Sequence, residues 1–387
     1  MRRTGAGRLQ TCTGSTRRAR ERIRRGRPAP VPGAVPGTAT KIALGGGGTA
    51  PSPVEVIAMT GAQNDISKRT SYDVIVIGGG AGGLNAALVL ARARRAVAVV
   101  DSGKPRNAPS AHMHGFLSRD GMPPLTVLEA GRAEVERYGA VRIDGAVEQV
   151  DAGEAGGYVV RLEGGATLDA RHVVLATGLR DELPEIPGVR AMWGGDVHFC
   201  PYCHGYEVRD QPIVVLGVHP ASPGQALLLR QWSPHIVYVP HSRPLADEER
   251  ERMDARGVEV AEGPVAALLS KDGRLHAVEL ADGRTVRCAG VFLFPGMTPN
   301  DGVFDGLGCA RDDQGRLVTD RAGRTSRPGL WAVGNVVDSR AQAVTAAGMG
   351  AAAAFALNHD LVDEETERDL AAYRAAADAS GAPVPAS

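Results

Sequence analysis

A short, buried strand that runs into a glycine-rich loop is the feature that most constrains the fold of this chain. Residues 73–77 read Asp-Val-Ile-Val-Ile, a continuous run that is typical of a strand buried on both faces. The run leads directly into a G-x-G-x-x-G pattern at Gly78, Gly80 and Gly83, and a helix is predicted over residues 82–94. These features predict an α/β fold built on a parallel sheet.

Each glycine of this loop has its own physical role in binding a dinucleotide. Gly78 permits the tight turn, Gly80 lets a pyrophosphate approach the backbone, and Gly83 lets the helix pack closely on the strand. The positive end of the helix attracts the phosphates. A second apolar run, residues 96–100, ends at Asp101, about 20 residues beyond the glycines, where a carboxylate can accept hydrogen bonds from a ribose. The sequence therefore predicts a complete dinucleotide site.

Two of the five cysteines lie close together in residues 199–205, Phe-Cys-Pro-Tyr-Cys-His-Gly. A pair spaced like Cys200 and Cys203 can close a disulfide within one turn of chain and reopen it on receiving two electrons. Pro201 suits the first position of a helix, which would place Cys200 at the positive end, where a thiolate is favoured. His204 can pass protons near neutral pH. The motif predicts a catalytic redox pair with a neighbouring proton relay.

Three other interpretations of the cysteine pair are weaker. A structural zinc site would need a fourth ligand at a recognisable spacing, and the sequence has neither a second Cys-x-x-Cys nor a His-x-x-x-His run. A purely structural disulfide is disfavoured by the small number of cysteines. A glutaredoxin-like module would place the motif after the first strand of a small domain, whereas roughly 130 residues of ordered sequence precede it here. We expect no metal ligands.

A second strand–turn–helix–strand unit follows the cysteine motif. A buried strand ends at Gly217, and a helix and a further strand, residues 236–239, come next. His219 stands where a second dinucleotide pattern would have glycine. NADPH would need a cluster of arginines after the second strand for its 2′-phosphate, and only His241 and Arg243 stand there. This unit predicts a Rossmann-like shape in which NADPH binding is possible but weak.

Small-residue turns after two other strands complete the first dinucleotide site. Residues 146–172 are predicted to form short strands, and the buried strand after them ends in the turn Ala176-Thr177-Gly178, which lets the backbone approach a dinucleotide. In the loop after Asp101, Arg106 and Asn107 could lie beside an adenosine or a phosphate, although a solvated loop explains them equally well.

The last part of the chain returns to the first sheet. A stiff connector at residues 184–188 marks a domain boundary. A final strand ends at Gly334 and Asn335, and an alanine-rich helix is predicted from Ala343 to Leu357. The N-terminus of that helix would present N–H donors and a positive end to an electron-rich ring edge.

Composition excludes several classes of function. Lys plus Arg equals Asp plus Glu at 44 each, so no overall charge suggests nucleic acid or an anionic membrane as a partner. No apolar run approaches the roughly 20 residues that span a bilayer. Residues 1–71 are Arg/Pro/Gly-rich and are expected to be disordered, as are residues 376–387. The low cysteine content favours a reducing compartment, and we expect a cytoplasmic protein.

The order of these motifs resembles the low-molecular-weight thioredoxin reductases over roughly residues 72–373. The resemblance rests on the first glycine loop with Asp101, the turn at residues 176–178, the cysteine pair that opens the second domain, and the Gly334 turn followed by Gln342-Ala343-Val344. It implies two Rossmann-like three-layer α/β domains and a homodimer. An FAD domain (72–187 and 300–375) would be split by an inserted NAD(P)-type domain (188–299).

The resemblance also assigns roles to single residues. Cys203 would face the flavin, and Cys200 would meet the substrate, which is a small dithiol or disulfide or a thioredoxin-like protein. The residues expected to bind FAD are Gly78, Gly80, Gly83, Asp101, Arg106, Asn107, Ala176, Thr177, Gly178, Gly334, Asn335, Gln342, Ala343 and Val344.

Three departures from the thioredoxin reductase pattern change the expected function. His204 and Asn335 stand where those enzymes usually have aspartates, and the second dinucleotide pattern is eroded. The chain is in these respects more similar to the dithiol oxidases that form disulfides in gliotoxin, holomycin and related natural products. We therefore expect an FAD-dependent thiol–disulfide oxidoreductase that oxidises a small dithiol with O2 as acceptor. An NADPH-dependent thioredoxin reductase and a non-catalytic flavin redox sensor remain as alternatives.

Overall fold

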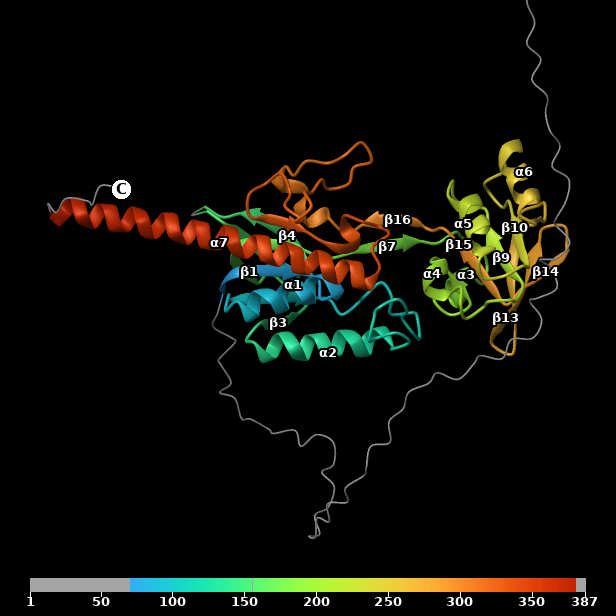
Figure 1. Ribbon diagram of the computed structural model, residues 1–387, viewed down its shortest axis with the longest axis horizontal. Coiled ribbons are helices and arrows are strands. Elements are labelled where there is room, and N and C mark those ends of the chain that lie inside the picture. The colour runs from blue at the N-terminus through green and yellow to red at the C-terminus, as the bar shows by residue number, and fades with distance from the viewer. Residues whose placement is uncertain (1–69, 155, 381–387) are drawn as a thin grey trace, which may run out of the picture. The chain divides into compact units, whose positions relative to one another are not determined.

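Two parallel sheets, built from different stretches of the chain, organise the computed structural model, which describes residues 70–154 and 156–380 (Figure 1). The first strand starts at Ser71, within one residue of the position predicted from the sequence. The disorder expected for residues 1–71 otherwise concerns residues 1–69, which lie outside the described part of the chain, as do residues 381–387.

The first sheet has seven strands in the order β3-β2-β1-β6-β5-β4, with β17 beside β6. Strands β1, β2, β3, β6 and β17 pair in parallel, whereas β4 and β5 join antiparallel. The elements of this part are β1 (Ser71–Ile77), α1 (Ala81–Arg92), β2 (Val97–Asp101), α2 (Pro124–Arg137), β3 (Val141–Asp144), β4 (Val147–Ala152), β5 (Tyr158–Leu162), β6 (Thr167–Leu175), the 3-10 helix η2 (Gly302–Leu307), β17 (Leu330–Ala332), η3 (Gly334–Val336) and α7 (Ala343–Ser380).

Alternate residues of β1 enter two separate apolar layers, as the period of a strand requires. Val74 and Val76 pack against the layer formed by α1, α2 and α7, and α7 runs alongside α1 in Figure 1. Ile75 and Ile77 face the opposite layer, which β4, β5 and η2 supply with residues such as Phe304. Because both faces are covered, the apolar residues of the predicted run, 74–77, are all buried.

The second sheet repeats this design with five strands, all parallel, in the order β11-β10-β9-β15-β8. Helices α5 and α6 cover one face, and an antiparallel sheet of β12, β13 and β14 covers the other. The elements are α3 (Val189–Met192), β8 (Val197–His198), α4 (Pro201–His204), β9 (Ile213–Leu216), α5 (Ser222–Leu229), β10 (Ile236–Val239), α6 (Asp247–Ala255), β11 (Glu259–Val260), β12 (Val265–Lys271), β13 (Arg274–Leu280), β14 (Thr285–Arg287) and β15 (Gly290–Leu293).

A two-stranded antiparallel ribbon carries the chain between the two sheets. Strand β7 (Leu179–Glu182) leads out of the first sheet, and β16 (Gly296–Pro299) leads back to it. The predicted fold class is confirmed, because the strands of the second parallel sheet are inserted between β6 and β17 of the first.

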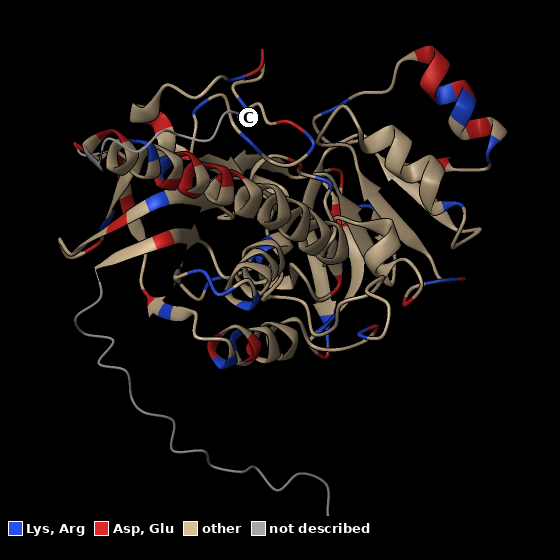
Figure 2. Cartoon of the chain, turned by 60° about the vertical axis from the view of Figure 1, so that its left-hand side comes forward, with Lys and Arg blue, Asp and Glu red and all other residues tan. Residues whose placement is uncertain are grey.

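Helix α7 is much longer than predicted. The sequence favoured a helix from Ala343 to Leu357, but the helix continues to Ser380 and so includes residues 376–380, which we expected to be disordered. Figure 2 shows acidic positions along the second half of this helix. The prediction rested on the alanine-rich composition of residues 343–357, which does not extend into the charged stretch at residues 363–369.

Ion pairs to the first sheet hold the second half of α7. Arg95 and Arg171 both donate to the Glu365 carboxylate, at 2.5 and 2.7 Å. Arg171 also donates to Glu364 at 2.8 Å. The buried His172 ring contacts the same Glu364 side chain at 3.0 Å. These partners lie more than 190 residues apart in the chain, so no local sequence pattern could predict the contacts.

Candidate active site

The predicted glycine loop opens into a large cavity of about 960 Å³. A Cβ added to Gly80 would meet no atom within 4 Å, so this residue leaves open space on the cavity wall. Gly78 and Gly83 serve close packing instead. A Cβ on Gly78 would collide with the Ala176 carbonyl, and a Cβ on Gly83 would collide with the Gly78 carbonyl. Gly78 also has a φ of +107°, which favours glycine.

Most residues predicted from sequence line this single cavity. They are Gly78, Gly80, Asp101, Arg106, Asn107, Ala176, Thr177, Gly178, Cys200, Cys203, His204, Gly334, Asn335, Gln342 and Ala343. Gly83 lies behind the loop in a backbone contact, and Val344 is 39% exposed and does not line the cavity. The cavity therefore brings the dinucleotide loop and the cysteine motif together, although they are more than 100 residues apart in the sequence.

Asp101 lies at the carboxyl end of β2, and its carboxylate can accept a further hydrogen bond from a hydroxyl. Its carboxylate accepts hydrogen bonds from the Gly103 amide at 3.2 Å and from the Arg132 guanidinium at 3.0 Å. Sequence reasoning missed Arg132, which lies in α2. The Nε of Arg132 is a buried donor that has no partner among the described residues. With the open space at Gly80, these polar groups fit a bound dinucleotide.

Arg106 has other partners than an adenosine or a free phosphate. It donates to both carboxylate oxygens of Asp181, at 2.7 and 2.9 Å, and to the Asn335 side-chain oxygen at 3.4 Å. Asn335 in turn donates to the carbonyls of Asp338 and Ala341, both at 2.9 Å. This chain of bonds ties the loop after β2 to strand β7 and to the turn that precedes α7.

The turn at residues 176–178 is locked to the returning chain. The Thr177 hydroxyl donates to the Asn300 carbonyl at 2.6 Å, and the Asn300 side chain donates back to the Thr177 carbonyl at 3.2 Å. The Asn300 amide also donates to the Gly178 carbonyl at 3.0 Å. Asn300 was not predicted, because its partners come from a distant strand end and no motif marks it.

Cys200 and Cys203 form a disulfide, with their Cα atoms 5.3 Å apart. As predicted, Pro201 occupies the first turn of helix α4, and Cys200 is its N-cap. The side chain of Gln342 contacts both sulfurs: its Nε2 lies 3.5 Å from Cys203 Sγ and 3.9 Å from Cys200 Sγ. The sequence suggested cofactor contact for Gln342 and gave no sign of this one.

His204 is a half-buried base beside the disulfide. Its Nε2 lies 3.5 Å from the Ser110 hydroxyl, and its ring stacks on His198 with centroids 4.5 Å apart and planes 12° apart. Burial lowers the pKa of His204, and Glu207 opposes this effect. Burial, with a smaller contribution from His204, lowers the pKa of His198 to about 3. A neutral imidazole at His204 can accept a thiol proton at neutral pH.

The turn after β9 is filled by its own side chains. The His219 amide donates to the Ser222 hydroxyl at 3.2 Å, and the Ser222 amide donates to the His219 carbonyl at 2.9 Å. The Ala221 amide donates to the His219 ring at 3.0 Å. Pro220 and Pro223 have no N–H. Every amide N–H of residues 219–223 is thus already bonded, and none is free to hold a pyrophosphate.

The His219 ring and the β9 turn also crowd this region. The ring stacks on Phe294, with centroids 4.6 Å apart. Gly217 packs against Tyr238, since a Cβ there would collide with the tyrosine hydroxyl. None of the four candidate pyridine-nucleotide residues lines the large cavity.

The two candidate cations after β10 are also engaged. Arg243 makes a two-pronged ion pair with the Glu249 carboxylate and donates to the Pro244 carbonyl at 2.9 Å. His241 accepts a hydrogen bond from the Val265 amide at 2.9 Å, and burial lowers its pKa. A neutral histidine and a paired arginine form a poor site for a 2′-phosphate.

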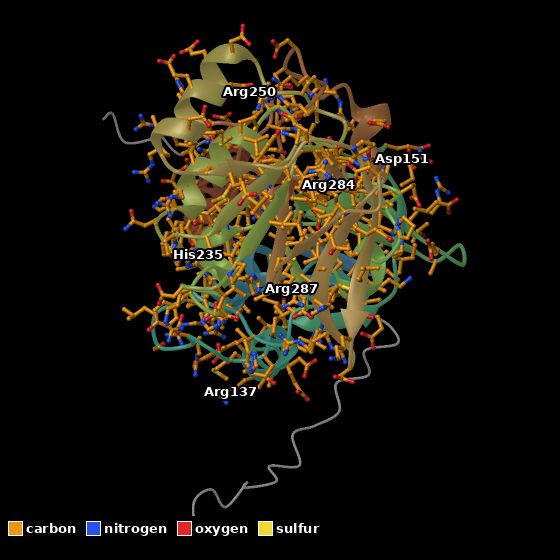
Figure 3. All side chains as sticks on the ribbon, turned by 90° about the vertical axis from the view of Figure 1, so that its right-hand side faces the viewer. Arg137, Asp151, His235, Arg250, Arg284 and Arg287 are labelled. Carbon is orange, nitrogen blue, oxygen red and sulfur yellow. A yellow bond between two sulfur atoms is a disulfide. The ribbon has the colours of Figure 1, made fainter. Side chains whose placement is uncertain are left out.

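Three other arginines of this domain have partners of their own. Arg250 and Arg284, both labelled in Figure 3, form ion pairs with Glu262 and Asp282. Arg230 donates to the carbonyls of Arg256 and Ser233, at 2.7 and 2.9 Å.

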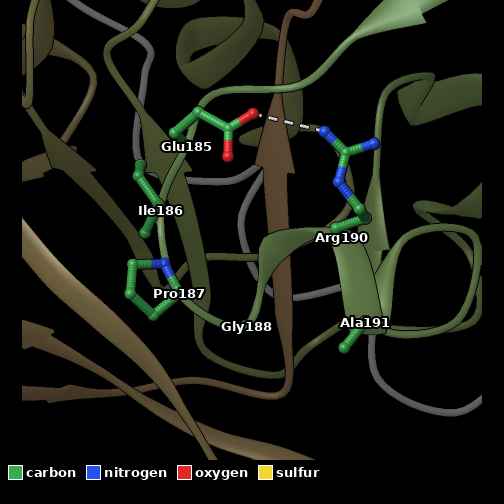
Figure 4. A pocket seen from close by; sticks show the side chains of 6 residues that line it. All are labelled: Glu185, Ile186, Pro187, Gly188, Arg190 and Ala191. Atoms are coloured by element: carbon green, nitrogen blue, oxygen red, sulfur yellow. Dashed lines mark hydrogen bonds and ion pairs between the residues drawn. The ribbon is translucent and has the colours of Figure 1, made fainter.

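A second hollow, at residues 185–191, carries no chemistry of its own (Figure 4). Its only ion pair joins Glu185 and Arg190 at 3.3 Å, and both side chains are more than 70% exposed. Such an exposed pair contributes little free energy. Within residues 70–154 and 156–380, no group of three or more His, Cys, Asp or Glu side chains is arranged to hold a metal. No helix in this part of the chain is long and apolar enough to cross a membrane.

Comparisons with known proteins agree with this geometry. The model of the family described as pyridine nucleotide-disulphide oxidoreductase matches residues 72–351. The chain is 30% identical over 343 residues to the probable thioredoxin reductase of Arthroderma benhamiae, a match that covers 80% of this chain and 85% of that protein.

Two solved structures extend the likeness. The crystal structure of HlmI is similar with 58% identity and a TM-score of 0.76, covering 81% of this chain and 98% of that one. The putative thioredoxin reductase TrxB from Bacillus anthracis is similar with 31% identity and a TM-score of 0.73, covering 76% and 99%.

Proposed function

The chain belongs to the pyridine nucleotide-disulphide oxidoreductase family and is a thioredoxin reductase-like enzyme acting on sulfur groups, and we propose that it oxidises a small dithiol to a disulfide with FAD as cofactor and O2 as acceptor. Family membership implies the use of a flavin and a pyridine nucleotide. One observation carries the proposal: the Cys200–Cys203 disulfide lies on the wall of the same cavity into which the Gly80 loop opens.

The proposed chemistry begins at Cys200. His204 accepts a proton from a substrate thiol, and the resulting thiolate attacks Cys200 Sγ, so that Cys203 leaves as a thiolate. The second thiol of the substrate attacks the mixed disulfide, and the product leaves with its new S–S bond. The enzyme then holds two reduced cysteines. A bound flavin would accept two electrons from them and pass these electrons to oxygen.

The proposed direction of electron flow, from the dithiol to the flavin, is inferred from the second domain. The bonded N–H groups of residues 219–223 and the Arg243–Glu249 pair leave little with which to hold NADPH. The alternative, an NADPH-dependent thioredoxin reductase, draws support from the intact second parallel sheet, which has the shape that a pyridine nucleotide would need. The third candidate, a redox sensor, would show no turnover with any dithiol.

Oxygen uptake tests the proposal. A small dithiol added without any pyridine nucleotide should produce O2 consumption that is equimolar with disulfide formation, because two electrons leave each dithiol and two reduce O2 to peroxide. An oxygen electrode and a thiol assay measure the two quantities. Uptake that requires NADPH, or no uptake with any dithiol, would contradict the proposal.

A substitution in the glycine loop tests the cofactor site. Gly80→Val should fold, because Gly80 has an ordinary φ of −76° and ψ of −178°, but its side chain would fill the space proposed for the pyrophosphate. We expect flavin retention to weaken on the order of tenfold or more. The absorbance of purified protein at flavin wavelengths measures this, and circular dichroism checks folding. A Gly80→Val protein with full flavin absorbance would contradict the proposal that the pyrophosphate binds at this loop.

The remaining parts of the proposal follow from the same features. We place the FAD-binding part at residues 72–187 and 300–375, which contain the first sheet, and the NAD(P)-type part at 188–299, which contains the second. We also propose a homodimer, by likeness to the thioredoxin reductases. The low cysteine content, five in 387 residues, is typical of proteins in a reducing compartment and supports a cytoplasmic location.

A further inference from the structure

Gln342 is the polar side chain that contacts the reacting sulfurs most directly. Its amide Nε2 lies 3.5 Å from Cys203 Sγ and 3.9 Å from Cys200 Sγ, and it is the residue before α7 begins. A Cβ added to Gly115 would lie 3.5 Å from the Gln342 Oε1 and 3.9 Å from its Nε2, so the amide group lies between that loop and the disulfide. The amide nitrogen, which is the donor, contacts both sulfurs.

We propose that Gln342 is a catalytic residue that stabilises the thiolate released from Cys203 when Cys200 is attacked. The inference rests on the proposed function, because it concerns the exchange step of the same cysteine pair. In that step the substrate thiolate forms a bond to Cys200 Sγ, and the Cys200–Cys203 bond breaks. Cys203 Sγ keeps the electron pair as a thiolate, to which the Gln342 amide donates a hydrogen bond.

Two physical effects act in the same direction on this sulfur. A disulfide sulfur is a weak, neutral acceptor, whereas a thiolate accepts a charge-assisted hydrogen bond that is roughly twice as strong. The bond therefore strengthens as the leaving sulfur gains charge, which is the condition for lowering a barrier. The N-terminus of the 38-residue helix α7 begins at the next residue and adds its positive end.

The asymmetry of the contact also bears on which cysteine is the leaving group. The amide is closer to Cys203 than to Cys200 by the difference between 3.5 and 3.9 Å. The Gln342 amide is therefore better placed to stabilise a thiolate on Cys203 than one on Cys200. This agrees with the proposed roles, in which Cys200 meets the substrate and Cys203 is displaced.

A single-cysteine comparison tests the inference. In a Cys200→Ser background, the alkylation rate of Cys203 by iodoacetamide is followed against pH, and the modified peptide is quantified by mass spectrometry. Adding Gln342→Leu, which keeps bulk but removes the donor, should move the midpoint of this profile up by about one pH unit. That is roughly tenfold less thiolate at neutral pH, or about 1.4 kcal/mol. Gln342→Glu should move the midpoint up further, because it places a carboxylate beside the sulfur.

Controls separate the possible failures. Gln149→Leu makes the same change at an exposed site whose amide contacts only Asp151, and it should leave the profile unchanged. Cys288 does not interfere, since burial raises its pKa to about 12. An unchanged midpoint in both Gln342 variants would overturn the inference while leaving the proposed function intact. If no dithiol reduced the Cys200–Cys203 disulfide of the wild-type protein, the proposed function itself would fail.

Discussion

A Cys203→Ser protein is expected to lose dithiol oxidation by roughly a thousandfold or more, and its free Cys200 thiol is expected to exchange with an added disulfide and keep one half of it as a stable mixed disulfide. The pair is oxidised in the structure, and the Cys203 sulfur is the one nearer to Gln342. Without the Cys203 thiol, a disulfide between Cys200 and one substrate thiol has no partner within the protein that can resolve it. Mass spectrometry of the intact protein, after brief exposure to a monothiol disulfide, measures the adduct.

Cys200→Ser should fail in a different way. It retains the thiol assigned to the flavin side, so it should lose turnover equally but form no substrate adduct. With flavin bound, it should show a long-wavelength charge-transfer absorbance from the Cys203 thiolate. Cys309→Ser is the matched control and should leave turnover unchanged, because Cys309 does not line the cavity: it packs against an apolar layer of the first sheet, and its thiol lies 3.8 Å from the Thr325 hydroxyl. Adducts on Cys203 rather than Cys200 would exchange the two roles.

The second large effect concerns the electron donor: NADPH should reduce the flavin about a hundredfold or more slowly than a dithiol does. A pyrophosphate would have to break the His219–Ala221 and His219–Ser222 bonds to gain backbone donors. A 2′-phosphate would have to draw Arg243 from Glu249. Each charge-assisted contact that is forgone is worth roughly 1.5–3 kcal/mol, and two such losses correspond to a hundredfold or more in affinity.

Variants of the same loop sharpen this prediction. His219→Gly combined with Glu249→Gln should free backbone space and release Arg243, so NADPH should reduce the flavin faster in the double variant than in the wild type. Arg250→Gln, on the outer face of the same domain, is the control and should change nothing. A double variant no faster than the wild type would mean that these contacts do not limit the reaction.

The sequence predicted those parts of the fold and site that local patterns determine. A few neighbouring residues were enough to predict three features: the apolar run at residues 73–77, the glycine loop and the Cys-x-x-Cys motif. Helix α2 was missed because only Pro124, Leu128 and Val135 of its fourteen residues are buried, which leaves a weak period.

What the sequence could not predict depends on distant partners. The Gln342 contact with Cys203 joins residues 139 apart, and Arg171 holds Glu365 across 194. The effect of His219 was foreseen as an imidazole in place of glycine. Its bond to the Ala221 amide was not, because side-chain capping of a turn depends on a rotamer that the sequence does not determine.

Anaerobic stopped-flow mixing shows whether a dithiol or a pyridine nucleotide is the electron donor to the flavin. Purified, flavin-loaded protein is mixed separately with a small dithiol, NADPH and NADH, each at the same concentration, and flavin absorbance is followed. We predict rapid bleaching by the dithiol, dependent on Cys200 and Cys203, and bleaching by either pyridine nucleotide that is slower by about a hundredfold or more. Bleaching by micromolar NADPH within the dead time, while the dithiol lags, would contradict it and make the protein a reductase.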